Sequence, residues 1–452
     1  MIHAMMYKKT KAFVAVALLV PTISMMAQTD TTKVNQLSVG MNVMTHGEMM
    51  KGGLPVDRDT EMDDNSNFLL GRFRLVVDYN RRGLDAHAVI QNKTVWGSGN
   101  DQALNLYEGW VKMTAPFGLF AQVGRIALAY DDERIIGTND FAMAALSHDV
   151  VRVGYEGYGH KVHAIVGYNQ NDSHVYSSTY YDNSIGSQLY KTMLTAWYHY
   201  DVPKFPLGAS LLFMNIGMQA GRHGGVNSNS PSTEYQQMYG GYVNFHPKYV
   251  TLEGSYYRQG GNGVDDSRHA KEIEAWMASV KATVNPTDRY GFVLGYDYLS
   301  GDDYVPVIYG GTMGMVYHKV NKGFNPLYGS RSKFYGIMDY FYQSAYINGF
   351  TPGLQNIFVG ATGKPFSKLD CSATYHYLSV ATDLDGLDRT LGHSFDLQAS
   401  YSFTKDISLT AGYTMMFGTE TMDRLKQGNS SKTAQWGWFS LVVSPRFFST
   451  RF

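Results

Sequence analysis

The lengths of the connections between alternating apolar and polar segments restrict the fold of this chain more than any other feature. Short connections, such as those at 81–83, 157–160, 246–249 and 404–406, alternate along the chain with long polar ones, such as those at 131–147 and 300–352. Membrane β-barrels have this rhythm, because tight turns join their strands at one rim and longer loops join them at the other. A soluble β-sandwich has no reason to keep it. We therefore expect an all-β fold, a transmembrane antiparallel up-and-down β-barrel of about eighteen strands.

The segments themselves have the two-residue period of strands. Between 391 and 403, Phe395 and Leu397 fall on one face, whereas Ser394, Asp396 and Gln398 fall on the other. Such a strand has one apolar and one polar face. An even number of strands also lets the first and last strands pair, which leaves no free sheet edge. The expected strands are 35–50, 67–80, 84–92, 104–113, 118–130, 148–156, 161–169, 189–200, 207–219, 235–245, 250–259, 273–283, 289–299, 353–362, 368–378, 391–403, 407–417 and 434–447.

Composition excludes several classes of function. The 38 Lys and Arg residues are matched by 39 Asp and Glu residues, so there is no basic surface excess for nucleic acid. The single cysteine excludes an internal disulfide framework and a four-cysteine metal cluster. The chain has no H-E-x-x-H, G-x-S-x-G or P-loop motif, and we expect neither an enzyme nor a cofactor. Aromatic residues make up 14% of the chain and gather near the expected strand ends, as the girdles of membrane barrels do.

The N-terminus has the pattern of an export signal. Lys8, Lys9 and Lys11 precede an apolar run at 12–20, and Ala27 ends a stretch of mostly small residues. We expect residues 1–27 to be a cleaved signal peptide and residues 28–452 to form the barrel, located in the outer membrane of a bacterial cell. The alternative, a membrane anchor, is disfavoured because the uncharged stretch is too short to span a bilayer and contains a proline.

Charged residues on the polar face of the strands predict the lining of a lumen. The apolar face of a membrane barrel meets lipid, so the polar face turns inward. In the segment 67–80, Phe73 and Leu75 face outward, which places Arg72 and Arg74 inside. Arg125 has the opposite parity to Ile126 and is predicted inside as well. The predicted pore-lining residues are Arg72, Arg74, Asp78, Glu108, Arg125, Arg152, Glu156, Lys161 and Asp396.

Two interpretations of this lining stay open. The guanidinium groups of the early strands are able to hold carboxylate or phosphate groups of a solute through paired donors. Alternatively, they form salt bridges with Asp78, Glu108 and Glu156 that only brace the wall. The connection at 300–352 is predicted either to fold into the lumen as a constriction or to cap the barrel from outside. Its candidate constriction residues are Phe334, Tyr335, Asp339 and Phe341.

Several segments resemble the alginate-export family of bacterial outer-membrane β-barrel porins. They lie at 123–137, 147–153, 324–328, 333–341 and 353–357, with further similarity at 391–397 and 407–417. The resemblance implies a monomeric barrel of about eighteen strands and a pore for anionic or sugar-like solutes. Because members of the family differ in what they carry, the resemblance does not fix the substrate.

The sequence therefore predicts a porin or export channel that passes hydrophilic, anionic or saccharide solutes by diffusion through a charged lumen. The expected partners are outer-membrane lipid, small anionic or sugar-like solutes and, as a further candidate, an acidic polysaccharide. The alternative is a surface-binding barrel whose long external loops grip a ligand or partner. A barrel-embedded hydrolase would need a Ser–His pair near the membrane interface, and no such pair stands out.

Overall fold

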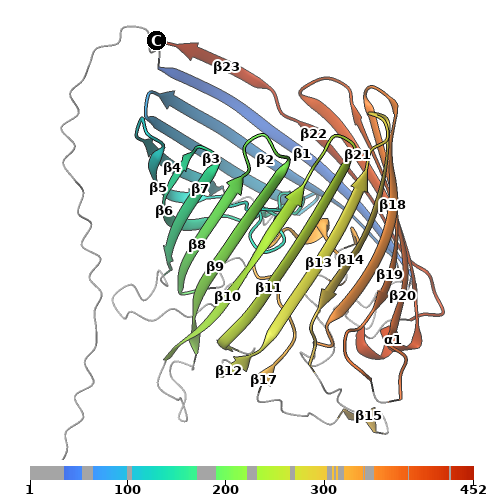
Figure 1. Ribbon diagram of the computed structural model, residues 1–452. Coiled ribbons are helices and arrows are strands. Elements are labelled where there is room, and N and C mark those ends of the chain that lie inside the picture. Colours follow the sequence, from blue (N-terminus) through green and yellow to red (C-terminus); the bar gives the residue numbers. More distant parts are fainter. Residues whose placement is uncertain are drawn as a thin grey trace, which may run out of the picture.

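The computed structural model forms a closed antiparallel β-barrel of eighteen strands (Figure 1). It describes residues 35–52, 65–98, 104–169, 190–220, 232–264, 270–302, 308–309, 312–313, 320–338, 341, 351–384, 386–426 and 429–452. Each wall strand pairs with its neighbours along the chain, and β1 pairs with both β2 and β22. The pairing of the first and last wall strands therefore closes the sheet, as the even strand number predicts.

The wall strands agree closely with the expected segments. The first half of the wall consists of β1 (Gln36–Lys51), β2 (Asn65–Arg81), β3 (Leu84–Val95), β4 (Asn105–Thr114), β5 (Leu119–Ile126), β6 (His148–Gly157), β7 (His160–Tyr168), β8 (Thr192–Asp201) and β9 (Leu207–Ala220). The second half consists of β10 (Ser232–Phe245), β11 (Val250–Val264), β13 (Ala275–Val284), β14 (Tyr290–Leu299), β18 (Leu354–Phe366), β19 (Leu369–Ser379), β20 (Thr390–Ser402), β21 (Ile407–Gly418) and β22 (Ala434–Val443).

Short elements complete the structure. The last strand of the chain, β23, continues the pairing with β1 after an irregularity between Val39 and Gly40. None of the helices in the described part of the chain is long and apolar enough to cross a membrane. The short elements are β12 (Ala270–Ile273), β15 (Ile308–Tyr309), β16 (Thr312–Met313), β17 (Val320–Asn321), β23 (Arg446–Arg451), the 3-10 helix η2 (Arg331–Lys333) and α1 (Glu420–Lys426).

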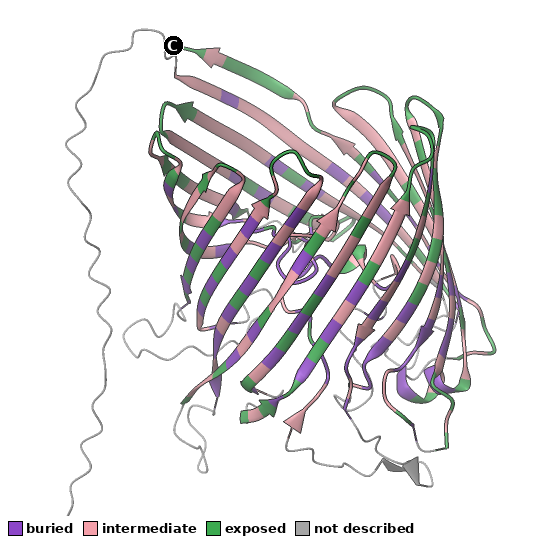
Figure 2. Ribbon diagram, viewed as in Figure 1, coloured by how far each residue is buried: buried purple, intermediate pink, exposed green. Residues whose placement is uncertain are grey.

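The two faces of the wall meet different surroundings. Figure 2 shows buried and exposed residues alternating along the strands. On β5, Val123 is 53% exposed on the outer face, whereas Gln122 is 2% exposed on the inner face. Large apolar residues with the outward parity are exposed on most other strands as well, among them Phe73, Val151, Leu294 and Leu397. The outer face therefore has the apolar character of a surface that contacts lipid.

Some strands are apolar on both faces. On β9, Leu211 is 64% exposed on the outer face, whereas Leu212 on the inner face is 4% exposed. Met214 and Ile216, further along the strand on the same inner face, are also buried. These inward side chains belong to the same buried cluster as Ile135 and Ile136 of the segment 127–147. The lumen is therefore partly filled by packed apolar side chains, which two-residue alternation alone does not predict.

The connections differ in length at the two rims. The turns at 82–83, 158–159 and 403–406 lie at the short-turn rim, which is uppermost in Figure 1. The long connections lie at the opposite, long-loop rim. One expected strand, 118–130, is shorter in the structure, because residues 127–130 leave the wall and enter the lumen. The expected signal peptide at 1–27 lies outside the described residues.

Candidate functional site

The segment 127–147, between β5 and β6, crosses the interior of the barrel (Figure 1). Asp131 accepts hydrogen bonds from Trp197 on β8 (3.1 Å) and Tyr257 on β11 (3.4 Å), whereas Phe141 contacts Trp436 and Trp438 on β22. The same segment thus touches wall strands on different sides of the barrel. It therefore occupies part of the lumen.

A second segment, 320–338, packs against the first. The Tyr328 N–H donates to the Ile135 carbonyl (3.1 Å), and the Gly137 N–H donates to the Tyr328 carbonyl (2.9 Å). The Ser330 hydroxyl donates to the Glu133 carboxylate (2.7 Å). We refer to residues 127–147 and 320–338 together as the lumen plug. Its second segment, 320–338, is the part of the long connection 300–352 that lies inside the barrel.

The backbone of the segment 127–147 depends on these contacts. Asp131, Glu133, Asn139 and Ala145 have positive φ angles of 54°, 67°, 46° and 54°. Residues with a side chain adopt this region at a cost of roughly 1 kcal/mol or more each. Contacts with the wall and with the second segment offset that cost. Loss of one of these contacts is therefore expected to loosen the segment.

Arg134 is the electrostatic centre of the lumen plug. It forms ion pairs with Asp297 on β14 (3.0 Å) and Asp132 (3.2 Å), and it donates to Tyr335 (3.1 Å). Its guanidinium also lies over the ring of Phe334, at 4.1 Å from the centroid. Burial by itself lowers the pKa of Arg134, but Asp297, Tyr335 and Asp132 outweigh it and raise that pKa well above its usual value. Arg134 is therefore a permanent cation that joins both plug segments to the wall.

Arg72 and Arg74 also bind the lumen plug. Both guanidinium groups contact the carboxylate of Asp140, with Nη1–Oδ1 distances of 3.2 Å and 2.6 Å. Arg74 further donates to Gln91 (2.7 Å) and lies 3.8 Å over the ring of Tyr107. Two buried cations therefore share one carboxylate. Arg72 Nε and Arg74 Nη2 are buried without a hydrogen-bond partner.

The other predicted lining residues of the early strands have local partners. Arg152 donates to Gln122 (3.0 Å) and Tyr130 (3.2 Å), both neutral. Lys161 pairs with Asp201 at 3.2 Å. None of these contacts joins a predicted cation to a predicted anion, so the specific bracing network proposed from the sequence does not form among them.

The predicted acidic residues pair instead with histidines and backbone groups. Asp78 bonds His87 (2.7 Å), and Glu156 bonds His163 (3.0 Å). Glu108 accepts hydrogen bonds from Trp110 (3.1 Å) and the Ala127 N–H (3.3 Å). Asp396 contacts His376 (3.3 Å) and accepts from the Ile337 N–H (2.9 Å), which ties β20 to the lumen plug.

The inward placement of Arg125 is wrong. Val123 on β5 pairs with Val151 on β6, and both are exposed on the outer face. Arg125 and its partner Asp149 lie two residues further along the same strands, and a step of two residues keeps the same face, so Arg125 also points outward. The prediction required Ile126 to face lipid, but Ile126 is 3% exposed and packs with the lumen plug. Arg125 forms a bidentate contact with Asp149 instead, at 2.8 Å and 2.6 Å.

The predicted constriction residues are placed as follows. Tyr335 and Phe341 are buried inside, and Phe334 packs against the same cluster. Burial raises the pKa of the Tyr335 hydroxyl, which keeps that group neutral. Asp339 lies outside the described residues. The role of these residues in narrowing a pore stays a prediction.

The contacts of inner-face histidines with carboxylates form a feature that sequence reasoning missed, although the parity of the segment 161–169 places His163 inside. His46, His87, His163, His199 and His376 come from five wall strands, and each contacts a carboxylate. The usable signal was their parity, since each lies at an odd number of residues from an outward-facing apolar residue of its strand, as His163 does from Val162 and Val166. These contacts give the inner-face carboxylates hydrogen-bond partners on the wall itself.

The fold resembles solved outer-membrane proteins. Acinetobacter baumannii OccAB1 superposes with a TM-score of 0.61 at 13% identity, covering 91% of this chain and 97% of that one. Pseudomonas aeruginosa OccK9 (OpdG) gives 0.58 at 13% identity, covering 91% and 98%. A BenF-like porin from Pseudomonas fluorescens gives 0.57 at 10% identity, covering 91% and 99%. At these identities the likeness shows the fold alone.

Comparison with protein families adds no assignment. No family model and no curated protein matches the chain. The resemblance to the alginate-export family therefore gains no support from these comparisons and stays a prediction. What is shown is a closed eighteen-stranded antiparallel barrel of the kind found in the solved structures above.

Proposed function

We propose that the protein is an outer-membrane porin that passes small hydrophilic solutes by diffusion through its lumen. The observation that carries this proposal is the division of the wall into an exposed apolar outer face and a polar, charged inner face. A closed barrel satisfies its backbone groups internally and is therefore stable in a bilayer. The likeness in fold to a BenF-like porin supports the same function. No chemical step is involved.

The solutes are anionic or saccharide molecules. The guanidinium groups on the inner face of β2 and β6 support this class, because Arg72 and Arg74 share one carboxylate and Arg152 donates to the neutral groups of Gln122 and Tyr130. A fixed cation in a narrow lumen raises the local concentration of anions. An acidic polysaccharide, which the resemblance to the alginate-export family implies, is one member of this class. Residues 1–27 act as the export signal, and the barrel is monomeric.

One observation favours a second function. The buried apolar cluster of the lumen plug includes side chains from β9, β11 and β13 as well as from the plug itself. A lumen that stays filled would leave the barrel as an anchor for long loops that bind a partner. Solute passage separates the two functions.

Swelling of proteoliposomes tests the proposal. Vesicles containing the purified protein are diluted into isotonic neutral monosaccharide, neutral oligosaccharide or uronic-acid oligomer, and their turbidity is followed. The porin function predicts swelling that is fast for the monosaccharide and faster for uronic-acid oligomers than for neutral ones of equal length. Swelling at the rate of protein-free vesicles with every solute would leave the anchor function instead.

A further inference from the structure

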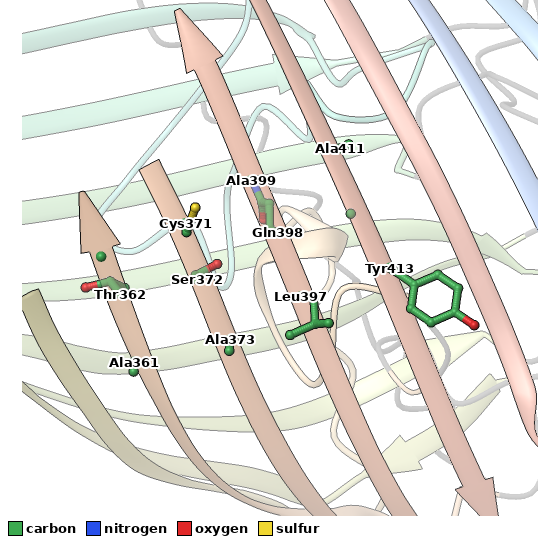
Figure 3. A pocket seen from close by; sticks show the side chains of 12 residues that line it. Ala361, Thr362, Cys371, Ser372, Ala373, Leu397, Gln398, Ala399, Ala411 and Tyr413 are labelled. Atoms are coloured by element: carbon green, nitrogen blue, oxygen red, sulfur yellow. The ribbon is translucent and has the colours of Figure 1, made fainter. Parts of the chain in front are cut away.

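The outer face of the barrel has a depression over four neighbouring strands. It has a volume of about 600 Å³ and lies over β18, β19, β20 and β21 (Figure 3). Small side chains make its floor on the outer face, because the register aligns Ala361 with Ala373, and Gly363 with Cys371, Ala399 and Ala411. Leu397 and Tyr413 also line it. These six small residues, in two neighbouring rows across four adjacent strands, leave room that the rows on either side fill with larger side chains.

Larger side chains bound the depression on both sides along the strands. Toward the long-loop rim the next outward row contains Val359, Tyr375 and Phe395. Toward the short-turn rim the next outward row contains Leu369 and Tyr401, and beyond that row lie the exposed rings of Phe366 and Phe403. The depression is thus an apolar seat in the lipid-facing band, closed by aromatic side chains at the end near the turns.

Two cations lie at the short turns next to this seat. Lys368 belongs to the turn between β18 and β19, and Lys405 belongs to the turn between β20 and β21. Both are exposed. Lys368 uses one donor on the Phe403 carbonyl (3.0 Å) and has three in all, and the described residues provide no carboxylate partner for Lys405. The nearby Lys364 is already paired with Asp370 at 2.7 Å.

The short-turn rim as a whole carries the same sign of charge. The basic residues in its turns or immediately next to them are Arg81, Arg82, Lys204, Lys248, Arg289, Lys368, Lys405 and Arg446. The acidic residues in the same positions are Asp201, Asp288 and Asp406. Since the chain has a net charge of only -1, this excess is local. Turns of a few residues cannot extend far beyond the strands, so these cations lie at the depth of lipid headgroups.

We propose that this seat binds one anionic phospholipid, with an acyl chain in the depression and the headgroup phosphate between Lys368 and Lys405. The inference rests on the proposed membrane location of the barrel. At about 3.3 Å per residue, the small side chains lie roughly 10–20 Å along the strands from the two turns. That interval matches the depth of an acyl chain below its headgroup, since half of a hydrocarbon core is about 15 Å thick. The exposed rings of Phe366 and Phe403 then lie at the boundary between the hydrocarbon core and the lipid headgroups, where aromatic side chains are favoured.

Cys371, the single cysteine of the chain, provides the probe for a test. A small fluorophore is attached to its Sγ, and bromine atoms on an acyl chain that enters the seat quench the fluorescence of this probe. Quenching is titrated with brominated phosphatidylglycerol and, separately, with brominated phosphatidylcholine. The anionic lipid should reach half-quenching at about a 25-fold lower mole fraction, since each of the two cations near the headgroup strengthens binding about fivefold. Equal half-quenching by the two lipids would overturn the proposal.

Matched variants show whether the two lysines cause the preference. Lys368→Gln with Lys405→Gln should abolish it, whereas Lys51→Gln with Arg424→Gln, at the long-loop rim, should leave it unchanged. Loss of the preference in both pairs would indicate a general charge effect and overturn the local seat. Ala373→Phe should weaken quenching by both lipids because it fills the depression, and unchanged quenching would exclude the seat for the chain. Channel currents recorded from the same preparations test the porin function separately, since lipid binding does not require an open lumen.

Discussion

Arg152 is the cation of the inner wall that is best placed to act on a passing anion. Its guanidinium donates to Gln122 and Tyr130, and it forms no ion pair with any carboxylate in the described part of the chain. Arg125, only one strand away, pairs with Asp149 on the outer face. The two arginines therefore have similar sequence surroundings and opposite positions, which makes them a matched pair.

Replacing Arg152 should reduce anion preference, whereas replacing Arg125 should not. A unit charge about 5 Å from an ion in water contributes ~0.8 kcal/mol, which is roughly fourfold in the permeability ratio. Arg152→Gln is thus expected to shift the reversal potential in a salt gradient toward cation preference by about that factor. The same measurement on Arg125→Gln provides the control. An unchanged ratio in folded Arg152→Gln protein would mean that Arg152 only braces the wall.

At the scale of elements, the first segment of the lumen plug depends on a few polar contacts on both sides of its buried apolar residues Ile135 and Ile136. Asp140 holds the first segment to β2, and Glu133 holds it to the second segment through Ser330 and Lys333. The apolar part between them packs against the wall and gains stability from burial. The polar contacts therefore decide whether the segments stay in the lumen.

Asp140→Asn should loosen the segment 127–147 and raise the single-channel conductance. The substitution leaves Arg72 and Arg74 buried without an anion, and breaking such a pair costs about 3 kcal/mol or more. The matched control is Asp149→Asn, which removes the partner of Arg125 on the outer face and leaves the lumen plug intact. Equal conductance in the wild type and Asp140→Asn would show that Asp140 does not hold the segment.

Acid should weaken the contact between the two plug segments at a pH below that at which an ordinary glutamate titrates. Burial raises the pKa of Glu133, but hydrogen bonds from Lys333 and Ser330 outweigh it and lower that pKa from 4.5. A carboxylate with a lowered folded pKa stabilises the folded state above its unfolded pKa and loses this effect as pH falls through the folded value. Spin-label distances between the segments should therefore stay constant from pH 7 to about 4.5 and increase below it.

Glu133→Gln is the control for this pH dependence. Because glutamine does not titrate in this range, the variant should show the loosened distance already at pH 7 and little further change on acidification. A wild-type distance that increases above pH 5 would place the titration on another group. A distance that stays constant to pH 3 would show that the contact does not depend on the charge of Glu133.

At the scale of the whole molecule, the sequence determines the barrel because every strand has two faces in different media. Phe395 and Asp396 must lie on opposite faces, so the alternation alone assigns each residue of β20 to a face and excludes a one-residue slip of its register. The rhythm of the connections then supplies the strand number and the closure between β1 and β22. These features are local or periodic, which is why a single sequence reveals them.

The interior could not be predicted in the same way. Asp140 meets Arg72 and Arg74 only because the segment 127–147 turns inward, and no periodic pattern encodes that path. Two signals were present. Leu128, Ile135 and Ile136 are large apolar residues within a connection between strands, and Leu212 and Met214 interrupt the alternation of β9. In the structure both sets belong to one buried cluster. Large apolar residues in a connection, combined with apolar residues on the inner face of a strand, therefore indicate a filled lumen.

Single-channel recording of the wild-type protein tests the central claim most directly, that the barrel is a solute pore narrowed by the lumen plug. The purified, folded protein is added to a planar bilayer in symmetric salt, and currents are recorded at both polarities. The porin function predicts discrete, reproducible current steps from the wild type. Folded protein that inserts into the bilayer without any such steps would contradict it and leave the barrel as an anchor for its loops.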